Sequence, residues 1–191
     1  EIRLAETIEN EERFKKAKKH FSDATRLLQE VLEQVPNDLN ALQLAGQCYS
    51  LLEQYKDAKN HLEQAITILK ESRQYKNRII ANDTSMSIEQ EKETRRKLQQ
   101  DIRNEVAIRL LLASINKKEK QFGLELLEYD TILSLDPKNL EAMYARGMCH
   151  YQLGSVTECI RDLEDFISST TLPFESSAVQ RALKIITELK Q

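Results

Sequence analysis

Residues Asn139–Phe166 carry the sequence NLEAMYARGMCHYQLGSVTECIRDLEDF, and this stretch decides the fold. It predicts two helices joined by a tight turn, with one packing face made by Ala142, Gly147, Tyr151, Leu163 and Phe166. The same pattern of small and aromatic residues occurs earlier, in Asn40–Ala65, which has the sequence NALQLAGQCYSLLEQYKDAKNHLEQA. A pattern that recurs along a chain predicts a repeat architecture, in which each helix pair packs on its neighbours.

Composition supports a helical protein with a narrow core. The 191 residues include only 4 Gly and 3 Pro, with 40% hydrophobic and 31% charged residues. A net charge of −3 disfavours binding to nucleic acid or membrane through the molecule as a whole. The three isolated cysteines indicate packing roles in a reducing compartment, so we expect a cytoplasmic protein. The sequence begins with Glu rather than Met, from which we expect a fragment of a longer protein.

Both stretches resemble tetratricopeptide repeats, a family in which each repeat of about 34 residues forms two antiparallel helices, A and B. The resemblance implies an all-α fold, a single domain over residues 1–191 built as a right-handed superhelix of antiparallel helix pairs. It places repeats at residues 5–38, 39–72, 106–139 and 140–173, and a C-terminal capping helix at residues 176–190.

The first and third repeats depart from the family pattern. In the first, Glu11 and Glu12 lie where helix A needs a large and a small apolar residue, so either helix A is shifted in register or this end is a solvated cap. Its second half fits: Phe21 closes helix A, Ala24 belongs to helix B, and a proline follows at 36. In the third, Glu125 opens helix B in place of the usual Ala, which predicts looser packing between its two helices.

Residues 73–105 break the repeat pattern and predict a projecting helical hairpin. Helix B of the second repeat is expected to continue to about Ile80. Helix A of the third is expected to start near Ile88, after a capping box of Ser87 and Gln90, and to run to about Lys118.

The family resemblance implies a non-catalytic protein–protein interaction scaffold that binds a peptide or helix of a partner in the concave groove lined by the A helices. Side-chain amides, Tyr and Met offer the mixed polar and apolar contacts that such a ligand needs. The groove positions of the family correspond here to Asn40, Gln43, Gln47, Ser50, Leu51, Ala107, Leu110, Ser114, Lys117, Lys118, Glu141, Tyr144, Met148, Tyr151 and Gln152.

A co-chaperone carboxylate clamp is disfavoured, because Glu141 and Ala145 lie where Lys and Arg are needed, and Leu111 where Asn is needed. A Glu in that place would repel a carboxylate.

Other functional hypotheses rest on weaker signals in the sequence. The hairpin 73–105 could serve self-association, or docking within a larger assembly. The basic amphipathic segment 13–21 could bind anionic lipid or RNA, although the net negative charge counts against it. The three histidines are far apart and lack ligand partners at metal-binding spacing. With neither a nucleophile motif nor a glycine-rich phosphate loop, we expect no enzyme activity and no cofactor.

Overall fold

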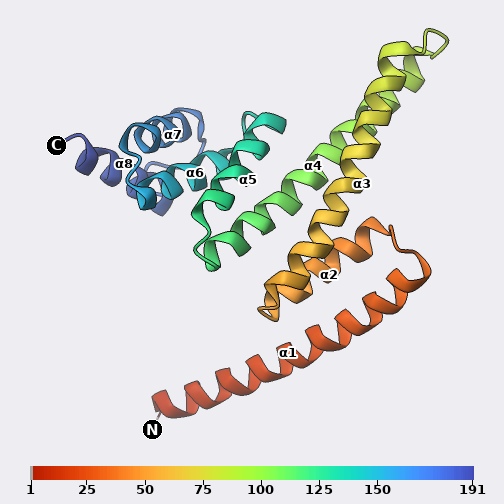
Figure 1. The fold of residues 1–191 in the computed structure, drawn as a ribbon. Helices are drawn as coiled ribbons and strands as arrows, with labels where there is room; N and C mark the ends of the chain where they lie inside the picture. Colours follow the sequence, from red (N-terminus) through yellow and green to blue (C-terminus); the bar gives the residue numbers. More distant parts are fainter. Residues whose placement is uncertain (1) are drawn as a thin grey trace. The chain divides into compact units, whose positions relative to one another are not determined.

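The protein is helical over the residues that the computed structural model describes, which are residues 2–191 for the backbone and 12–191 for the side chains (Figure 1). The helices are α1 (Ile2–Gln34), α2 (Leu39–Leu51), α3 (Tyr55–Asn82), α4 (Ile88–Lys118), α5 (Phe122–Leu135), α6 (Leu140–Leu153), α7 (Val156–Ser169) and α8 (Ser177–Leu189). Within residues 2–191 there is no strand, and the predicted all-α class is confirmed.

The chain forms two compact units, residues 1–101 and residues 102–191, and α4 passes from the first into the second. The first unit contains the first two predicted repeats, and the second unit contains the last two. The single domain and the right-handed superhelix stay predictions. None of the described helices combines the length and the apolar character that crossing a membrane requires.

In the first unit, α2 and α3 form the helix pair predicted for the second repeat. A Cβ atom on Gly46 would lie only 2.5 Å from Leu62 Cδ2, so the two helices approach as closely as a glycine allows. Asp38 caps α2, because its carboxylate accepts a hydrogen bond from the Ala41 amide at 2.8 Å. The Tyr49 ring stacks on His61 across the pair, at 5.2 Å between ring centroids.

The turn inside each helix pair has a shared geometry. Glu53, Lys120 and Gly154 have φ values of 63°, 58° and 72°, and each occupies the fifteenth position of its predicted repeat. This left-handed backbone conformation reverses the chain between helix A and helix B. The turns inside the pairs α2–α3, α4–α5 and α6–α7 therefore have equivalent backbone conformations.

The first repeat does not form a helix pair, and that prediction is wrong. Residues 2–34 form one uninterrupted helix, so the predicted turn after Phe21 is absent. The physical reason lies at the eighth position of the repeat, where Gly46 and Gly147 allow close approach but the first repeat has Glu12. A charged side chain there would have to be buried between two helices. The α1 helix does end where expected, just before Pro36.

The predicted hairpin is confirmed, since α3 continues to Asn82 and α4 begins at Ile88. Lys76 of α3 forms an ion pair with Asp101 of α4, which ties the hairpin together. The capping box is also present: the Gln90 amide donates to Ser87 Oγ at 3.2 Å, and the Ser87 amide donates to Gln90 Oε1 at 2.9 Å.

In the second unit, two apolar clusters join successive helices. One cluster packs α4, α5 and α6 around Ala113, Ile132 and Cys149. The other packs α6, α7 and α8 around Leu163 and Ile185, which confirms the capping helix. Because each cluster involves α6, this helix is held on both sides.

Glu125 of α5 lies in the interior of the second unit. Its side chain is fully buried, and the Tyr129 hydroxyl donates a hydrogen bond to it at 3.2 Å. Since this hydrogen bond lies within α5, the looser packing expected between the two helices of the third repeat stays a prediction.

Candidate functional site

The α6 helix carries the candidate site, and its start is fixed by a side-chain cap. Asn139 Oδ1 accepts a hydrogen bond from the Ala142 amide at 3.0 Å, and Asn139 Nδ2 donates to Asp136 at 3.1 Å. At Gly147, a Cβ atom would lie 2.8 Å from Leu163 Cδ2 of α7. The cap and this close approach fix the depth and the rotation at which α6 lies against its neighbours.

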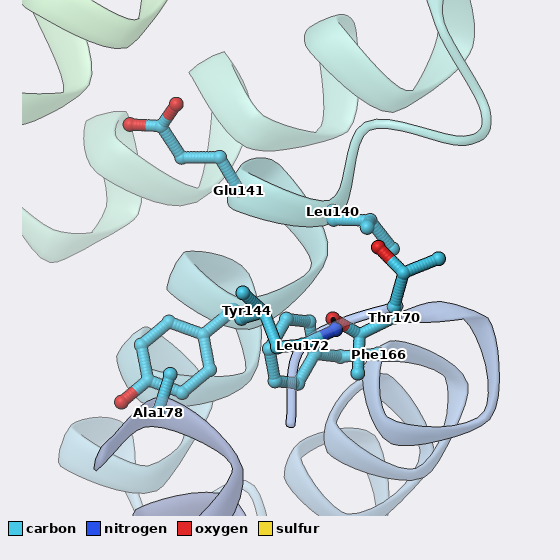
Figure 2. A pocket seen from close by; sticks show the side chains of 8 residues that line it. Leu140, Glu141, Tyr144, Phe166, Thr170, Leu172 and Ala178 are labelled. Atoms are coloured by element: carbon cyan, nitrogen blue, oxygen red, sulfur yellow. Dashed lines mark hydrogen bonds between the residues drawn. The ribbon is translucent and has the colours of Figure 1, made fainter. Parts of the chain in front are cut away.

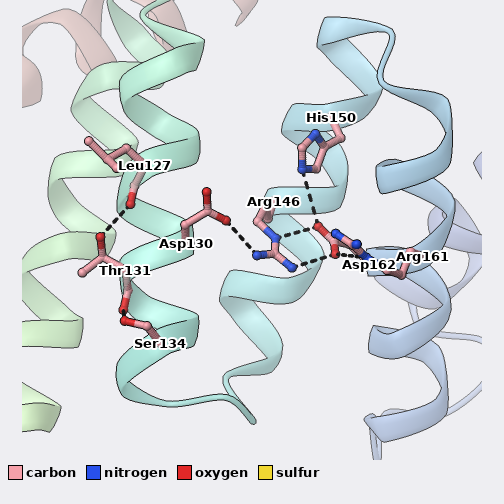
Figure 3. A network of polar contacts seen from close by, with 8 residues as sticks. All are labelled: Leu127, Asp130, Thr131, Ser134, Arg146, His150, Arg161 and Asp162. Carbon is pink, nitrogen blue, oxygen red and sulfur yellow. Dashed lines mark hydrogen bonds and ion pairs between the residues drawn. The ribbon is translucent and has the colours of Figure 1, made fainter.

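Arg146 links three consecutive helices (Figure 3). Its Nε and Nη2 atoms donate to the two oxygens of Asp162 on α7, at 2.7 and 2.8 Å, and Nη1 donates to Asp130 on α5 at 2.8 Å. Asp162 is only 1% exposed, so the bidentate arm neutralises a buried carboxylate. These hydrogen bonds raise the pKa of Arg146, which stays charged. The network makes α6 a rigid support.

An apolar hollow of about 350 Å³ lies between the start of α6, the end of α7 and the start of α8 (Figure 2). Its volume is at the small end of the range of ligand pockets. The Tyr144 ring lies 5.0 Å from the Phe166 ring, centroid to centroid, and forms one wall. The lining residues are Leu140, Glu141, Tyr144, Phe166, Thr170, Thr171, Leu172 and Ala178.

The rim of the hollow has one charged side chain, Glu141, whose carboxylate Figure 2 shows set apart from the apolar groups. The opposite wall comes from the loop between α7 and α8. That loop is fixed by hydrogen bonds, in which the Leu172 amide donates to Thr170 Oγ1 at 3.2 Å and Gln180 Nε2 donates to the Phe174 carbonyl at 2.8 Å. Leu172 and Phe174 remain exposed beside the hollow. The result is a preformed apolar depression with a negative edge.

Two predicted groove residues are buried, and their assignment is corrected. Ser50 lies on the same face of α2 as Leu42 and Gly46, at successive spacings of four residues, and that face packs inward. Met148 lies in the apolar cluster that α8 completes, so the capping helix covers it. Neither side chain can contact a ligand in an open groove.

The other predicted positions are at the surface or half-buried. In the first unit, Asn40, Gln47 and Leu51 are exposed along α2, with Gln43 half-buried beside them. In the second unit, the exposed positions are Ala107, Ser114, Lys117, Lys118, Glu141, Tyr151 and Gln152, whereas Leu110 and Tyr144 are half-buried. Of these, only Glu141 and Tyr144 belong to the hollow.

Three surface residues, Leu44, Leu172 and Ala178, were not predicted from the sequence. Leu44 is exposed on α2 in line with Asn40 and Leu51, and its spacing of seven residues from Leu51 could have revealed it. Leu172 and Ala178 lie beyond α7, and their position opposite Tyr144 depends on the path of the α7–α8 loop. That path has no short-range signal in the sequence.

A second polar cluster, around Glu125, is suited to packing and not to reaction. Burial, aided by the charge of the Glu125 carboxylate, raises the pKa of the Cys149 thiol to about 12. The same two causes raise the pKa of Tyr129. Both groups stay protonated at neutral pH, where a thiolate nucleophile would have to be ionised. Among the described residues, no group of three or more His, Cys, Asp and Glu side chains could hold a metal ion.

A sequence comparison assigns the first part of the chain to a family. Residues 1–71 match the sequence model described as "Tetratricopeptide repeat". These residues cover α1, α2 and most of α3, and the pair α2–α3 has the close glycine contact and the left-handed turn already described. Residues 1–71 therefore belong to the tetratricopeptide repeat family. Among curated proteins, none matches the chain.

One solved structure agrees on the fold, and two others are given with it for comparison. The structure described as "MamA RS-1 ArsTM double mutant" aligns over 94% of this chain and 93% of its own, with 13% identity and a TM-score of 0.51. YrrB, described as a TPR protein with an unusual peptide-binding site, has 18% identity and a TM-score of 0.39 over 87% of this chain and 84% of its own. PilW, described as a type IV pilus biogenesis factor, has 14% identity and a TM-score of 0.37 over 89% of this chain and 83% of its own. The last two scores carry no argument about this chain.

Proposed function

We propose that this tetratricopeptide repeat protein is a non-catalytic scaffold that binds a peptide or helix of a partner protein at the exposed face of α6. Tetratricopeptide repeats are in general protein-interaction modules, and each buries its core against its neighbours while leaving one helix face for ligands. The observation that carries the proposal is the apolar hollow beside Tyr144. A well-formed apolar pocket with a few polar groups is the default candidate for a binding site.

The chemistry of the hollow defines the ligand. Tyr144, Phe166 and Leu172 provide aromatic and aliphatic walls that suit one large apolar side chain of a partner. Glu141 lies at the rim and favours a Lys or Arg next to that anchor, because an exposed carboxylate attracts a nearby cation. The ligand we propose is therefore a segment with a large apolar residue beside a basic one.

The first test is selection of random peptides displayed on phage, using the whole chain as bait. We expect the selected peptides to share an apolar anchor next to a basic residue. Leu172→Glu places a charge in the wall of the hollow and should weaken their binding at least about tenfold, or about 1.4 kcal/mol. The matched control is Leu153→Glu, since Leu153 is similarly exposed on α6 but does not line the hollow. Peptides that bind the Leu172→Glu variant as tightly as the native chain would refute the proposal.

A second candidate function rests on the α3–α4 hairpin. Tyr75 is 64% exposed on α3, and Ile88 is 86% exposed at the start of α4. Exposed large apolar side chains on a projecting hairpin suit docking within a larger assembly. Deleting residues 76–94 and joining the ends with a short linker should release the chain from such an assembly. Unchanged assembly after the deletion would remove this candidate.

A further inference from the structure

The α1 helix carries an apolar stripe that extends beyond the helix packed on it. The stripe residues recur at alternating spacings of three and four, which keeps them on one face: Phe14, Ala17, Phe21, Ala24, Leu28, Val31 and Val35. Phe14 is 57% exposed and Val31 is 44% exposed. The α2 helix packs on α1 in this region, where Thr25 is buried and the stripe residues Phe21, Ala24 and Leu28 are half-buried. Both ends of the stripe remain open.

The family pattern explains why the ends of this stripe are exposed in a single chain. The tetratricopeptide repeat match covers residues 1–71, and the repeat predicted at residues 5–38 would have a first helix that packs on residues 24–34. In α1 these two segments instead continue in one straight helix. Glu12 occupies the close-approach position and opposes a hairpin within one chain. The apolar face of the second half therefore lacks the helix that covers its counterparts in the other repeats.

We infer that two copies of this chain pair through α1 in antiparallel orientation, each copy covering the open stripe of the other. The stripe alternates large and small residues, and one antiparallel register matches them. Phe21 then faces Ala24 of the second copy, Ala17 faces Leu28, and Phe14 faces Val31. Two of these contacts set a large residue opposite alanine, which favours packing without voids or overlap. All three contacts share one register, and the two-fold axis makes each of them twice.

Charge favours the antiparallel orientation. The first half of the stripe is flanked by basic residues, namely Arg13, Lys15, Lys16, Lys18 and Lys19. The second half carries Glu30 and Glu33, with Arg26 as its one basic residue. Arg26 and Glu30 already pair on the surface of one copy at 2.6 Å, an exposed contact that contributes little. Antiparallel pairing sets the basic half of each copy against the acidic half of the other, with Lys15 near Glu30. Parallel pairing would bring the two basic halves together.

Light scattering of the whole chain tests the inference. We expect twice the mass of the 22.2 kDa chain. Val31→Glu should reduce dimer affinity more than tenfold, since a charge would enter an apolar contact, while circular dichroism should show unchanged helix content because Val31 is already partly exposed. Leu153→Glu, a similarly exposed site on α6, should leave the dimer intact. A native chain of single mass, or a dimer unaffected by Val31→Glu, would overturn the inference.

A rescue experiment tests the register. Phe14→Glu and Val31→Lys should each weaken the dimer, whereas the double variant should recover part of the lost affinity, because residue 14 of one copy then meets the opposite charge at residue 31 of the other. Carbodiimide cross-linking of mixed isotope-labelled and unlabelled chains should join Lys15 to Glu30 between copies. No recovery in the double variant, or cross-links confined to single copies, would contradict the antiparallel pair.

Discussion

Replacing Arg146 by Met should destabilise the second unit strongly. The methionine keeps much of the apolar stem and removes the guanidinium that contacts two carboxylates. The buried one, Asp162, would retain only the longer contacts to Arg161 Nε at 3.6 Å and His150 Nε2 at 3.8 Å. Neither distance is that of a good hydrogen bond, so the carboxylate would be left buried without adequate compensation.

The two ion pairs of Arg146 determine how much stability its replacement costs. Breaking a buried ion pair by removing one partner costs about 3–5 kcal/mol. We place this substitution near the lower end, about 3 kcal/mol, because the Arg146 side chain is 19% exposed and its removal admits water to Asp162. The other arm contributes little, since Asp130 is 59% exposed, and Asp130→Asn should cost about 0–1 kcal/mol.

Hydrogen exchange measured by mass spectrometry is the appropriate assay, because it reports each helix separately. We expect α5, α6 and α7 to exchange about a hundredfold faster in Arg146→Met, while α2 keeps its protection. In Arg146→Met/Asp162→Leu, both charges are gone and most of the stability should return. Protection that falls less than tenfold in the single variant, or a double variant as unstable as the single one, would refute this reasoning.

Three further predictions concern the backbone and the buried thiol. Gly147→Ala should cost about 1–3 kcal/mol in urea unfolding, because its Cβ would overlap Leu163, whereas Gly123→Ala meets no atom within 4 Å and should not destabilise. Lys120→Gly should raise the free energy of unfolding by about 1 kcal/mol, since Lys120 has a φ of 58°; an unchanged or lower value would contradict this. The pKa of Cys149 is raised from 9.0 to about 12, so its contribution to stability is complete below pH 9 and is lost as the pH rises toward 12. Stability of the native chain should therefore fall more steeply between pH 9 and pH 11 than that of Cys149→Ala, and equal slopes would show that the thiol is not linked to folding.

Local signals in the sequence predicted the helices well. Capping residues and apolar periodicity fixed the ends of α3 and α4 within about two residues, the usual limit for such boundaries. The Ser87 capping box acts within one turn of helix, and so it can be recognised without knowledge of the tertiary fold. The same is true of the amphipathic spacing that predicted α8.

Features that depend on distant contacts were not predicted. The family pattern suggested a turn after Phe21, but a straight helix results where Glu12 replaces the small residue needed for a close pair. Met148 was assigned to the groove because nothing in α6 alone shows that α8 covers it. The hollow was missed for the same reason, since its wall at Leu172 comes from a loop about thirty residues after Tyr144 in sequence and is placed by hydrogen bonds to its own neighbours.

The central claim is that the hollow on α6 holds an apolar anchor of a partner segment, next to a basic residue. The most direct measurement is the affinity of one selected peptide for the native chain, for Glu141→Lys and for Leu172→Glu, measured by isothermal titration. We predict that Leu172→Glu weakens binding at least about tenfold, and that Glu141→Lys weakens peptides with a basic neighbour but not those with a neutral one. Equal affinity for all three proteins would show that the peptide binds elsewhere and that the hollow is not the functional site.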